Sequence, residues 1–464
     1  MNIKINYPTY LAITAALGGF LFGYDAAVIS GTIKQVTQQF NLDTLSEGWY
    51  VGCALIGSIF GVSIGGILGD KFGRKNILIL SGILFAISAF WCMIAGSFQE
   101  LVNARIIGGI GIGIVSIISP LYISEISIPE NRGKMVTLYQ LAITIGFLGA
   151  YLINFMLLNL SHDSTFNPSA GSFIDLSFKQ EVWRSMLGLA TLPSILFIII
   201  ILFIPESPRW LILKNHESKA EAILQKIFGT IENAKIELNK TKEAIGQRVE
   251  SPWKEIRKPG ILKAVLIGAA IAILGQFMGV NAVLYYGPSI FESSGMSSGD
   301  SLYYQVIVGL VNVLTTVLAV FIIDKVGRKK LVYYGVSSMI VSLLLIALYF
   351  QFGKSLNLSS VYLLCFFLFY IFSCAISISA VIFVLLSEMF PIKVRGLAMS
   401  IAGFSLWAGT YLIGQLTPVF LETLKPAGTF YFFAAMCIPY IIIVWKLIPE
   451  TTGKPLEEIE KFWH

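Results

Sequence analysis

The segment GDKFGRKN at residues 69–76 returns as DKVGRKK at residues 324–330, and each copy directly follows a long apolar run. Two more pairs follow this one, in the same order in each half of the chain. They are SEISIPENRG (124–133) with SEMFPIKVRG (387–396), and PESPRWL (205–211) with PETTGKPLEE (449–458). Matched polar loops in one register indicate an internal duplication of a membrane-embedded unit. We therefore expect two similar halves.

The composition is that of a chain whose solvent is the lipid bilayer. Of its 464 residues, 56% are hydrophobic and only 13% are charged, whereas about a quarter of residues are charged in soluble proteins. Apolar runs of about 20 residues, the length a helix needs to cross a bilayer, recur along the chain. We predict an all-α polytopic membrane protein with twelve spans, at residues 9–30, 48–69, 76–96, 101–122, 134–158, 186–204, 261–286, 303–323, 331–351, 361–387, 396–420 and 428–448.

The basic residues predict the topology. When the 33 Lys and Arg residues are sorted by alternate loops, Arg105 lies inside a span and only five lie on one side: Lys34, Lys179, Arg184, Lys354 and Lys425. Cytoplasmic loops carry such an excess of Lys and Arg, so both termini are expected in the cytoplasm. The net charge of +6 is thus explained without a nucleic-acid partner. The first span is too long for a secretory signal, and we expect it to be retained.

The longest polar segment divides the spans six and six. We predict an N-terminal six-helix bundle at residues 1–205, a cytoplasmic linker at 206–260, a C-terminal six-helix bundle at 261–448 and a cytoplasmic tail at 449–464. Within the linker, SKAEAILQKIF and ENAKIELNKTKEAI mix apolar and charged residues at helical spacing. They are either short amphipathic helices or a solvated linker.

Together with GGFLFGYDAAVISG (18–31) and GQFMGVNAVLYY (275–286), the paired loops resemble the sugar porter family of the major facilitator superfamily. The resemblance covers essentially the whole chain. It implies two pseudo-symmetric six-helix bundles, alternating access, sugar and a proton as transported partners, and function as a monomer.

Only Asp25 and Arg105 are ionisable residues well inside the spans, which makes them functional candidates because a charge in hydrocarbon is costly. They are natural partners for each other. Burial disfavours a charged carboxylate while a nearby arginine favours it, so a modest rearrangement can load or release a proton. Proton-coupled bacterial members of the family have Asp at this place and facilitative animal members have Asn, so the resemblance implies symport. A structural ion pair that never titrates is the alternative.

The resemblance also implies a sugar site near the bilayer midplane, built from amides and aromatic faces. The matching positions are Phe22, Gln140, Gln276, Asn281, Asn312 and Trp407, with Tyr285 and Tyr286 as an outer gate. For a lone Asn or Gln in a span, an interhelical hydrogen bond is the ordinary explanation. The sequence departs from the family where Gly275 precedes Gln276, where Phe147 replaces a second glutamine, and where a Gly-Pro element is absent near Ser379. We expect a less polar pocket.

The paired loops place acids near arginines on the cytoplasmic side. The resemblance implies an ion-pair network that favours the outward-facing state and breaks as the carrier opens inward. Its predicted members are Asp70, Arg74, Glu125, Arg132, Asp324, Arg328, Glu388 and Arg395. The alternative is positive charge that serves topology alone.

No motif indicates an enzyme, a cofactor or a metal site. The three histidines, His162, His216 and His464, lie in a loop, the linker and the tail. The cysteines lie in apolar spans without C-x-x-C spacing. GGIGIG (108–113) lies within an apolar run with no preceding strand, so it predicts close helix packing rather than nucleotide binding.

The sequence therefore predicts a secondary active importer of a pentose, hexose or related polyol by proton symport, in a bacterial inner membrane. A facilitative uniporter is the first alternative, and a drug or organic-ion exporter of the same superfamily is the second. A non-transporting sugar receptor is a third, which we expect to carry a longer cytoplasmic tail than residues 449–464.

Overall fold

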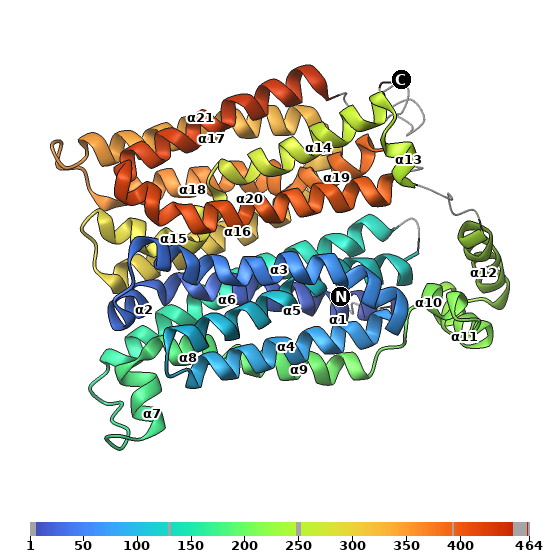
Figure 1. The fold of residues 1–464 in the computed structure, drawn as a ribbon, viewed down its shortest axis with the longest axis horizontal. Coiled ribbons are helices and arrows are strands. Elements are labelled where there is room, and N and C mark those ends of the chain that lie inside the picture. Colours follow the sequence, from blue (N-terminus) through green and yellow to red (C-terminus); the bar gives the residue numbers. More distant parts are fainter. Residues whose placement is uncertain (1–5, 129–130, 247–251, 392–393, 449–461, 463–464) are drawn as a thin grey trace, which may run out of the picture. The chain divides into compact units, whose positions relative to one another are not determined.

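The computed structural model describes residues 6–128, 131–246, 252–391, 394–448 and 462 (Figure 1). Within these ranges the chain is helical and contains no strand. The same ranges hold twelve helical spans long and apolar enough to cross a membrane: Tyr7–Gly31, Thr44–Phe72, Arg74–Ile94, Phe98–Ile126, Arg132–His162, Val182–Leu202, Pro259–Ser293, Ser298–Ile323, Arg328–Phe352, Ser360–Leu386, Arg395–Thr423 and Lys425–Leu447. The predicted all-α fold with twelve spans is confirmed.

The chain forms two compact units, of which the first comprises Met1–Val28, Ile56–Ala150 and Leu176–Glu250. Its helices are α1 (Tyr7–Val28), α4 (Arg74–Ile94), α5 (Phe98–Ile126), α8 (Val182–Gly188), α9 (Thr191–Leu202), α10 (Pro208–Leu213), α11 (Glu217–Phe228) and α12 (Ile231–Gly246), with most of α3 (Thr44–Phe72) and of α6 (Arg132–His162). Helix α5 packs against both α1 and α4, and α9 also packs against α4.

Glycines allow the helices of this unit to approach closely. A Cβ atom at Gly113 of α5 would lie 2.2 Å from the Ser58 carbonyl oxygen of α3, and one at Gly57 would lie 2.2 Å from that of Ile106. Small residues permit such backbone contact between membrane helices. The predicted packing role of GGIGIG is confirmed at Gly113.

The second unit comprises Ile29–Leu55, Tyr151–Asp175 and Ser251–His464. Its elements are η1 (Ile29–Gly31), α2 (Ile33–Phe40), α7 (Phe173–Asp175), α13 (Pro252–Ile256), α14 (Pro259–Phe277), α15 (Val280–Ser293), α16 (Ser298–Val326), α17 (Arg328–Phe352), α18 (Ser360–Ile376), α19 (Ile378–Met389), α20 (Arg395–Thr423) and α21 (Lys425–Leu447). A single π turn, η3 (Leu176–Gln180), follows α7 and belongs to the first unit.

Two segments from early in the chain are grouped with this second unit because they bond to its helices. Tyr151 donates to the Leu284 carbonyl at 2.8 Å, and Gln415 donates to that of Leu45 at 3.0 Å. Lys34 forms an ion pair with Glu292 at 2.9 Å. The domain boundaries that we place at 205 and 260 thus stay a prediction, and the compact units follow a different division.

The linker region contains helices over both amphipathic stretches. Helices α10, α11 and α12 lie beside one another (Figure 1). They share a small apolar core made of Leu211, Ile212, Ala220, Leu224, Ala234 and Leu238.

Two spans of the second unit are interrupted. Helix α14 ends at Phe277 and α15 begins at Val280, with Gly279 between them at φ 91°. The Tyr370 hydroxyl donates to the freed Met278 carbonyl at 2.7 Å, as the membrane requires of a broken helix. The other break lies at Ser377, between α18 and α19. The span that lacks the family's proline-bearing element is therefore broken all the same.

Candidate functional site

The predicted pair of ionisable residues lies together inside the first unit. Asp25 comes from α1 and Arg105 from the second turn of α5, and their side chains meet at 3.0 Å between Oδ1 and Nη1. The same guanidinium also donates to the Asp25 carbonyl, at 3.4 Å from Nη1 and 3.3 Å from Nη2. Arg105 thus binds both the side chain and the backbone of Asp25.

Both partners are deeply buried, with Asp25 6% and Arg105 2% exposed. Removing one partner of a buried pair leaves an uncompensated charge, which costs roughly 3–5 kcal/mol. A proton on Asp25 cancels its charge without removing any atoms. The pair is therefore a place where binding a proton changes the attraction between α1 and α5.

Three polar side chains meet at the break in the α14–α15 span. The Oε1 atom of Gln276 accepts from Asn281 Nδ2 at 2.7 Å and from Thr410 Oγ1 at 3.1 Å. Gly409, beside Thr410 on α20, lets the two helices approach, because its Cβ would lie 3.2 Å from the Gln276 side chain. This polar cluster of Gln276, Asn281 and Thr410 holds two of the predicted sugar-binding residues in direct contact.

Within the described part of the chain, the amide N–H groups of Gln276 have no hydrogen-bond partner and can donate to a ligand. The same holds for the carbonyl oxygen of Asn281 and for one of its N–H groups. Both residues are half-buried, whereas Thr410 is buried. The cluster can thus both donate to and accept from hydroxyl groups, which is what a sugar requires.

The other predicted sugar and gate residues are distributed over both units. Asn312 on α16 is half-buried, while Trp407 on α20 and the gate residues Tyr285 and Tyr286 are buried. The Tyr286 hydroxyl donates to the Gly414 carbonyl at 2.6 Å, which ties α15 to α20. Phe22 and Gln140 are half-buried residues of the first unit, on α1 and α6.

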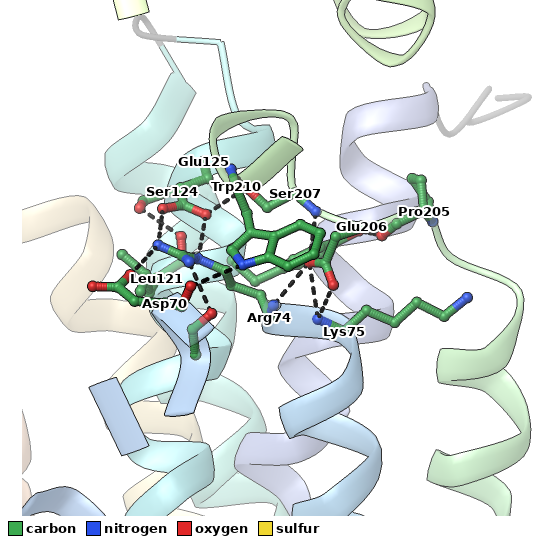
Figure 2. Close-up of polar contacts among 12 residues, drawn as sticks. Asp70, Arg74, Lys75, Leu121, Ser124, Glu125, Pro205, Glu206, Ser207 and Trp210 are labelled. Carbon is green, nitrogen blue, oxygen red and sulfur yellow. Dashed lines mark hydrogen bonds and ion pairs between the residues drawn. The ribbon is translucent and has the colours of Figure 1, made fainter. Parts of the chain in front are cut away.

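Arg74 lies at the centre of a group of charged side chains in the first unit (Figure 2). We call Asp70, Arg74, Glu125 and Glu206 the charged loop cluster. The Arg74 guanidinium donates to both oxygens of Glu125, each at 3.0 Å, and to the Gly69 carbonyl at 3.0 Å. It also forms an ion pair with Asp70 at 3.0 Å. The structure therefore brings together three of the predicted network residues, with Arg74 and Glu125 almost fully enclosed.

Glu206 completes this cluster by capping α4. Its Oε1 accepts from the backbone N–H groups of Arg74 at 2.8 Å, Lys75 at 3.1 Å and Ser207 at 2.8 Å. A carboxylate at this position satisfies amides that have no partner within the helix. Burial raises the pKa of the Glu206 carboxyl above its ordinary value, although these N–H groups and the Arg74 charge oppose the shift.

The second unit repeats part of this arrangement. Gly73 and Gly327 precede α4 and α17 with matching φ angles of 96° and 97°. Lys75 donates to the Leu202 carbonyl at 2.8 Å, and its counterpart Lys329 donates to those of Trp445 and Ile448 at 2.8 and 2.9 Å. The repeated sequence motif thus corresponds to repeated geometry.

The remaining predicted network residues lie farther from one another than Asp70, Arg74 and Glu125 do. Arg328 approaches Glu388 at 3.4 Å, and Arg395 donates to the Phe390 carbonyl. Arg132 is exposed at the start of α6. The side chain of Asp324 lies outside the described part of the chain.

Three contributors were not among the predicted site residues. The Thr410 hydroxyl also lies 2.9 Å from the Leu406 carbonyl of its own helix, as threonine hydroxyls in helices commonly do, so the sequence alone does not single it out. Tyr370 donates to the Met278 carbonyl, which lies at the break between α14 and α15, and the sequence does not show that the two meet. Glu206 is visible in PESPRWL, but its role depends on the fold, which brings it to the start of α4.

The chain matches the family model described as "Sugar (and other) transporter" over residues 11–463. It is 37% identical to the arabinose-proton symporter of Bacillus subtilis (strain 168), over 99% of this chain and 96% of that protein. It is 34% identical to the D-xylose-proton symporter of Escherichia coli (strain K12), over 100% of this chain and 97% of that protein.

A comparison with solved structures indicates the same family. An inward-open structure of the xylose transporter XylE from E. coli superposes with a TM-score of 0.83 at 32% identity, covering 99% of this chain and 100% of that one. These similarities confirm the predicted sugar porter family and its major facilitator fold. The chain is thus a multi-pass membrane protein that belongs to the sugar transporter family.

Proposed function

We propose that this protein imports a monosaccharide together with a proton, by alternating access. The observation that carries the proposal is the buried ion pair between Asp25 and Arg105. Relatives similar over nearly the whole chain are named proton symporters of arabinose and xylose. An ionisable pair enclosed within the first unit is the kind of group that a proton-driven cycle needs.

Protonation of Asp25 is the coupling step in this proposal. With Asp25 charged, the bonds from Arg105 hold α1 against α5. Once Asp25 carries a proton, the attraction between full charges is lost and the two helices can rearrange. Sugar binding and proton binding favour the same rearranged state, so the two ligands move together.

The sugar site in this proposal includes the polar cluster of Gln276, Asn281 and Thr410. The remaining members are Phe22, Gln140, Asn312 and Trp407, with Tyr285 and Tyr286 as gate residues. Half-buried amides that both donate and accept suit a pentose, a hexose or a related polyol. One 37% identical relative is named a glucose transporter.

We further propose that the charged loop cluster and its partner around Arg328 lie on the cytoplasmic side. The bias of Lys and Arg residues supports this orientation, with both termini in the cytoplasm. The compact ion pairs there favour one state of the carrier and separate as it opens. We also propose that the protein lies in a bacterial inner membrane and functions as a monomer.

The test uses purified protein in liposomes that contain a pH-sensitive dye, with a panel of pentoses, hexoses and inositol. One sugar should acidify the lumen in the native protein and not in Asp25→Asn, while counterflow exchange of that sugar survives in both. Asp43→Asn is the matched control, because Asp43 is an exposed carboxylate outside the spans. Exchange without proton movement in the native protein would instead establish the uniporter.

A further inference from the structure

Helices α15 and α20 each contain an internal proline that frees a backbone carbonyl. Pro288 lies inside α15 and Pro418 lies inside α20. Because proline has no backbone N–H, the carbonyl four residues earlier loses its donor within the helix. The two carbonyls are those of Leu284 and Gly414. In a membrane such a carbonyl needs a donor from elsewhere in the protein.

A tyrosine hydroxyl from another helix satisfies each of these carbonyls. The Tyr151 hydroxyl donates to the Leu284 carbonyl at 2.8 Å, and the Tyr286 hydroxyl donates to the Gly414 carbonyl at 2.6 Å. Both tyrosines are almost fully buried, with Tyr151 1% and Tyr286 0% exposed. Gln305 Nε2 lies 3.3 Å from the Leu284 oxygen and is a second, weaker donor. Each proline thus creates an acceptor to which a side chain of a neighbouring helix binds.

Both bonds involve α15, the helix that carries the proposed outer gate. Tyr151, a residue of α6 that is grouped with the second unit, binds α15, and α15 in turn binds α20 through Tyr286. The break at Gly279 separates α15 from α14, so α15 can move as a separate segment. The gate residues Tyr285 and Tyr286 are 4% and 0% exposed, which describes a closed gate. Any movement of α15 away from α6 must break the Tyr151 bond.

We propose that Tyr151 is a positioning residue for the outer gate, and that its hydroxyl holds the gate closed by binding the carbonyl that Pro288 frees. The inference rests on the proposed gate role of Tyr285 and Tyr286. Since α15 cannot satisfy the Leu284 carbonyl by itself, the closed state gains a bond that the open state exchanges for water. The bond from Tyr286 to the Gly414 carbonyl stabilises the closed gate in the same way.

A role for Tyr151 in packing alone makes a different prediction. Tyr151→Phe keeps the ring and removes only the hydroxyl, so a residue that merely fills space would leave the gate unchanged. Tyr440 on α21 provides the matched control. It is a tyrosine of the same unit, 0% exposed, and its hydroxyl has no hydrogen-bond partner in the described part of the chain. Tyr440→Phe therefore removes a buried hydroxyl without breaking a bond of this kind.

The experiment compares the two faces of the carrier in the absence of a pH gradient. The KM for sugar entry is measured in intact cells that express the protein, and the KM from the cytoplasmic face is measured in inverted membrane vesicles. Radiolabelled arabinose, D-xylose, glucose and inositol are the probes. External sugar binds only to carriers whose outer gate is open, so its apparent affinity rises with the open fraction.

Tyr151→Phe should lower the ratio of the entry KM to the cytoplasmic KM about fivefold, which is the factor that corresponds to about 1 kcal/mol for one hydrogen bond. Tyr440→Phe should leave the ratio unchanged. A loss of packing alone would lower the Vmax and leave the ratio as it is in the native protein.

Pro288→Ala tests whether the freed carbonyl is the origin of the effect. The alanine restores an N–H group at residue 288, so the Leu284 carbonyl regains its bond within α15 and needs Tyr151 less. In this background Tyr151→Phe should change the KM ratio less than twofold. Tyr286→Phe removes the second bond and should lower the ratio as Tyr151→Phe does, and this variant replaces Pro288→Ala as the second test if the latter does not fold.

Two results overturn the inference. One is a native KM ratio in Tyr151→Phe, and the other is a change of the same size when Tyr151→Phe is combined with Pro288→Ala. The proposed function fails separately, if the native protein transports none of the probes or if Asp25→Asn retains proton coupling. If Asp25→Asn loses coupling while Tyr151→Phe keeps the native KM ratio, only the role of Tyr151 is refuted.

Discussion

Glu206 caps α4, and two substitutions can separate the contribution of its side-chain oxygen atom from that of its charge. Three backbone N–H groups, those of Arg74, Lys75 and Ser207, donate to the single atom Oε1, and only Lys75 also approaches Oε2 at 3.2 Å. Glu206→Gln can keep an oxygen in the place of Oε1, so the three bonds survive. Glu206→Ala removes the acceptor and leaves three amides without it.

The structure gives the expected size of this effect. A buried donor left unsatisfied costs about 1–3 kcal/mol, and a lost helix cap costs about 0.5–2 kcal/mol. The loop is partly open to water, which can replace some of these bonds, so we expect about 2–3 kcal/mol in total for Glu206→Ala. For a unit of this size the loss corresponds to a fall of about 5–10 °C in apparent Tm.

The assay is thermal unfolding of the purified protein in detergent, followed by tryptophan fluorescence at one fixed scan rate because membrane proteins unfold irreversibly. Glu206→Gln should unfold within about 2 °C of the native protein, and Glu206→Ala well below it. Equal losses in both variants would show that charge, and not the shared oxygen, matters. An unchanged Tm in Glu206→Ala would refute the capping role.

Three further predictions follow from the same contacts. Thr410→Val should weaken sugar binding severalfold, because it removes one of the two bonds that orient Gln276, and Thr410→Ser should restore it; equilibrium binding of the transported sugar checks this. Gly279→Ala should lower the apparent Tm, since Gly279 has a φ of 91° and its Cβ would lie 2.5 Å from the Phe433 ring; a native Tm would contradict the observed break. Because the folded-state pKa of Glu206 is raised above 4.5, the protonated form is favoured on folding, so its stabilising contribution is complete below that pH and is lost as the pH rises through the raised pKa. The Tm of the native protein should therefore fall relative to that of Glu206→Gln as the pH rises from 4 to 7. If the native Tm instead rose relative to that of Glu206→Gln, the folded-state pKa of Glu206 would be lowered and not raised.

The fold was largely predictable because hydropathy and loop charge act over whole segments. Twenty apolar residues specify a span regardless of their order, and the long polar segment at residues 206–260 divides the predicted spans six and six. The pairing of Asp25 with Arg105 was predictable for the same kind of reason, since two isolated charges in hydrocarbon need each other.

The finer features depend on contacts between distant segments. The break at Ser377 has no proline or glycine to announce it, and it lies where Gly335 of α17 approaches so closely that a Cβ there would be 2.1 Å from Ser377 Cβ. Such relations arise only when the helices are packed.

The central claim is tested most directly by measuring the sugar and proton fluxes together in the same liposomes. With a radiolabelled sugar and a calibrated pH dye, the native protein should move about one proton per sugar molecule, because a single carboxyl group binds one proton, and Asp25→Asn should move sugar with no accompanying proton. A native ratio near zero, or an unchanged ratio in Asp25→Asn, would contradict proton coupling through the Asp25–Arg105 pair.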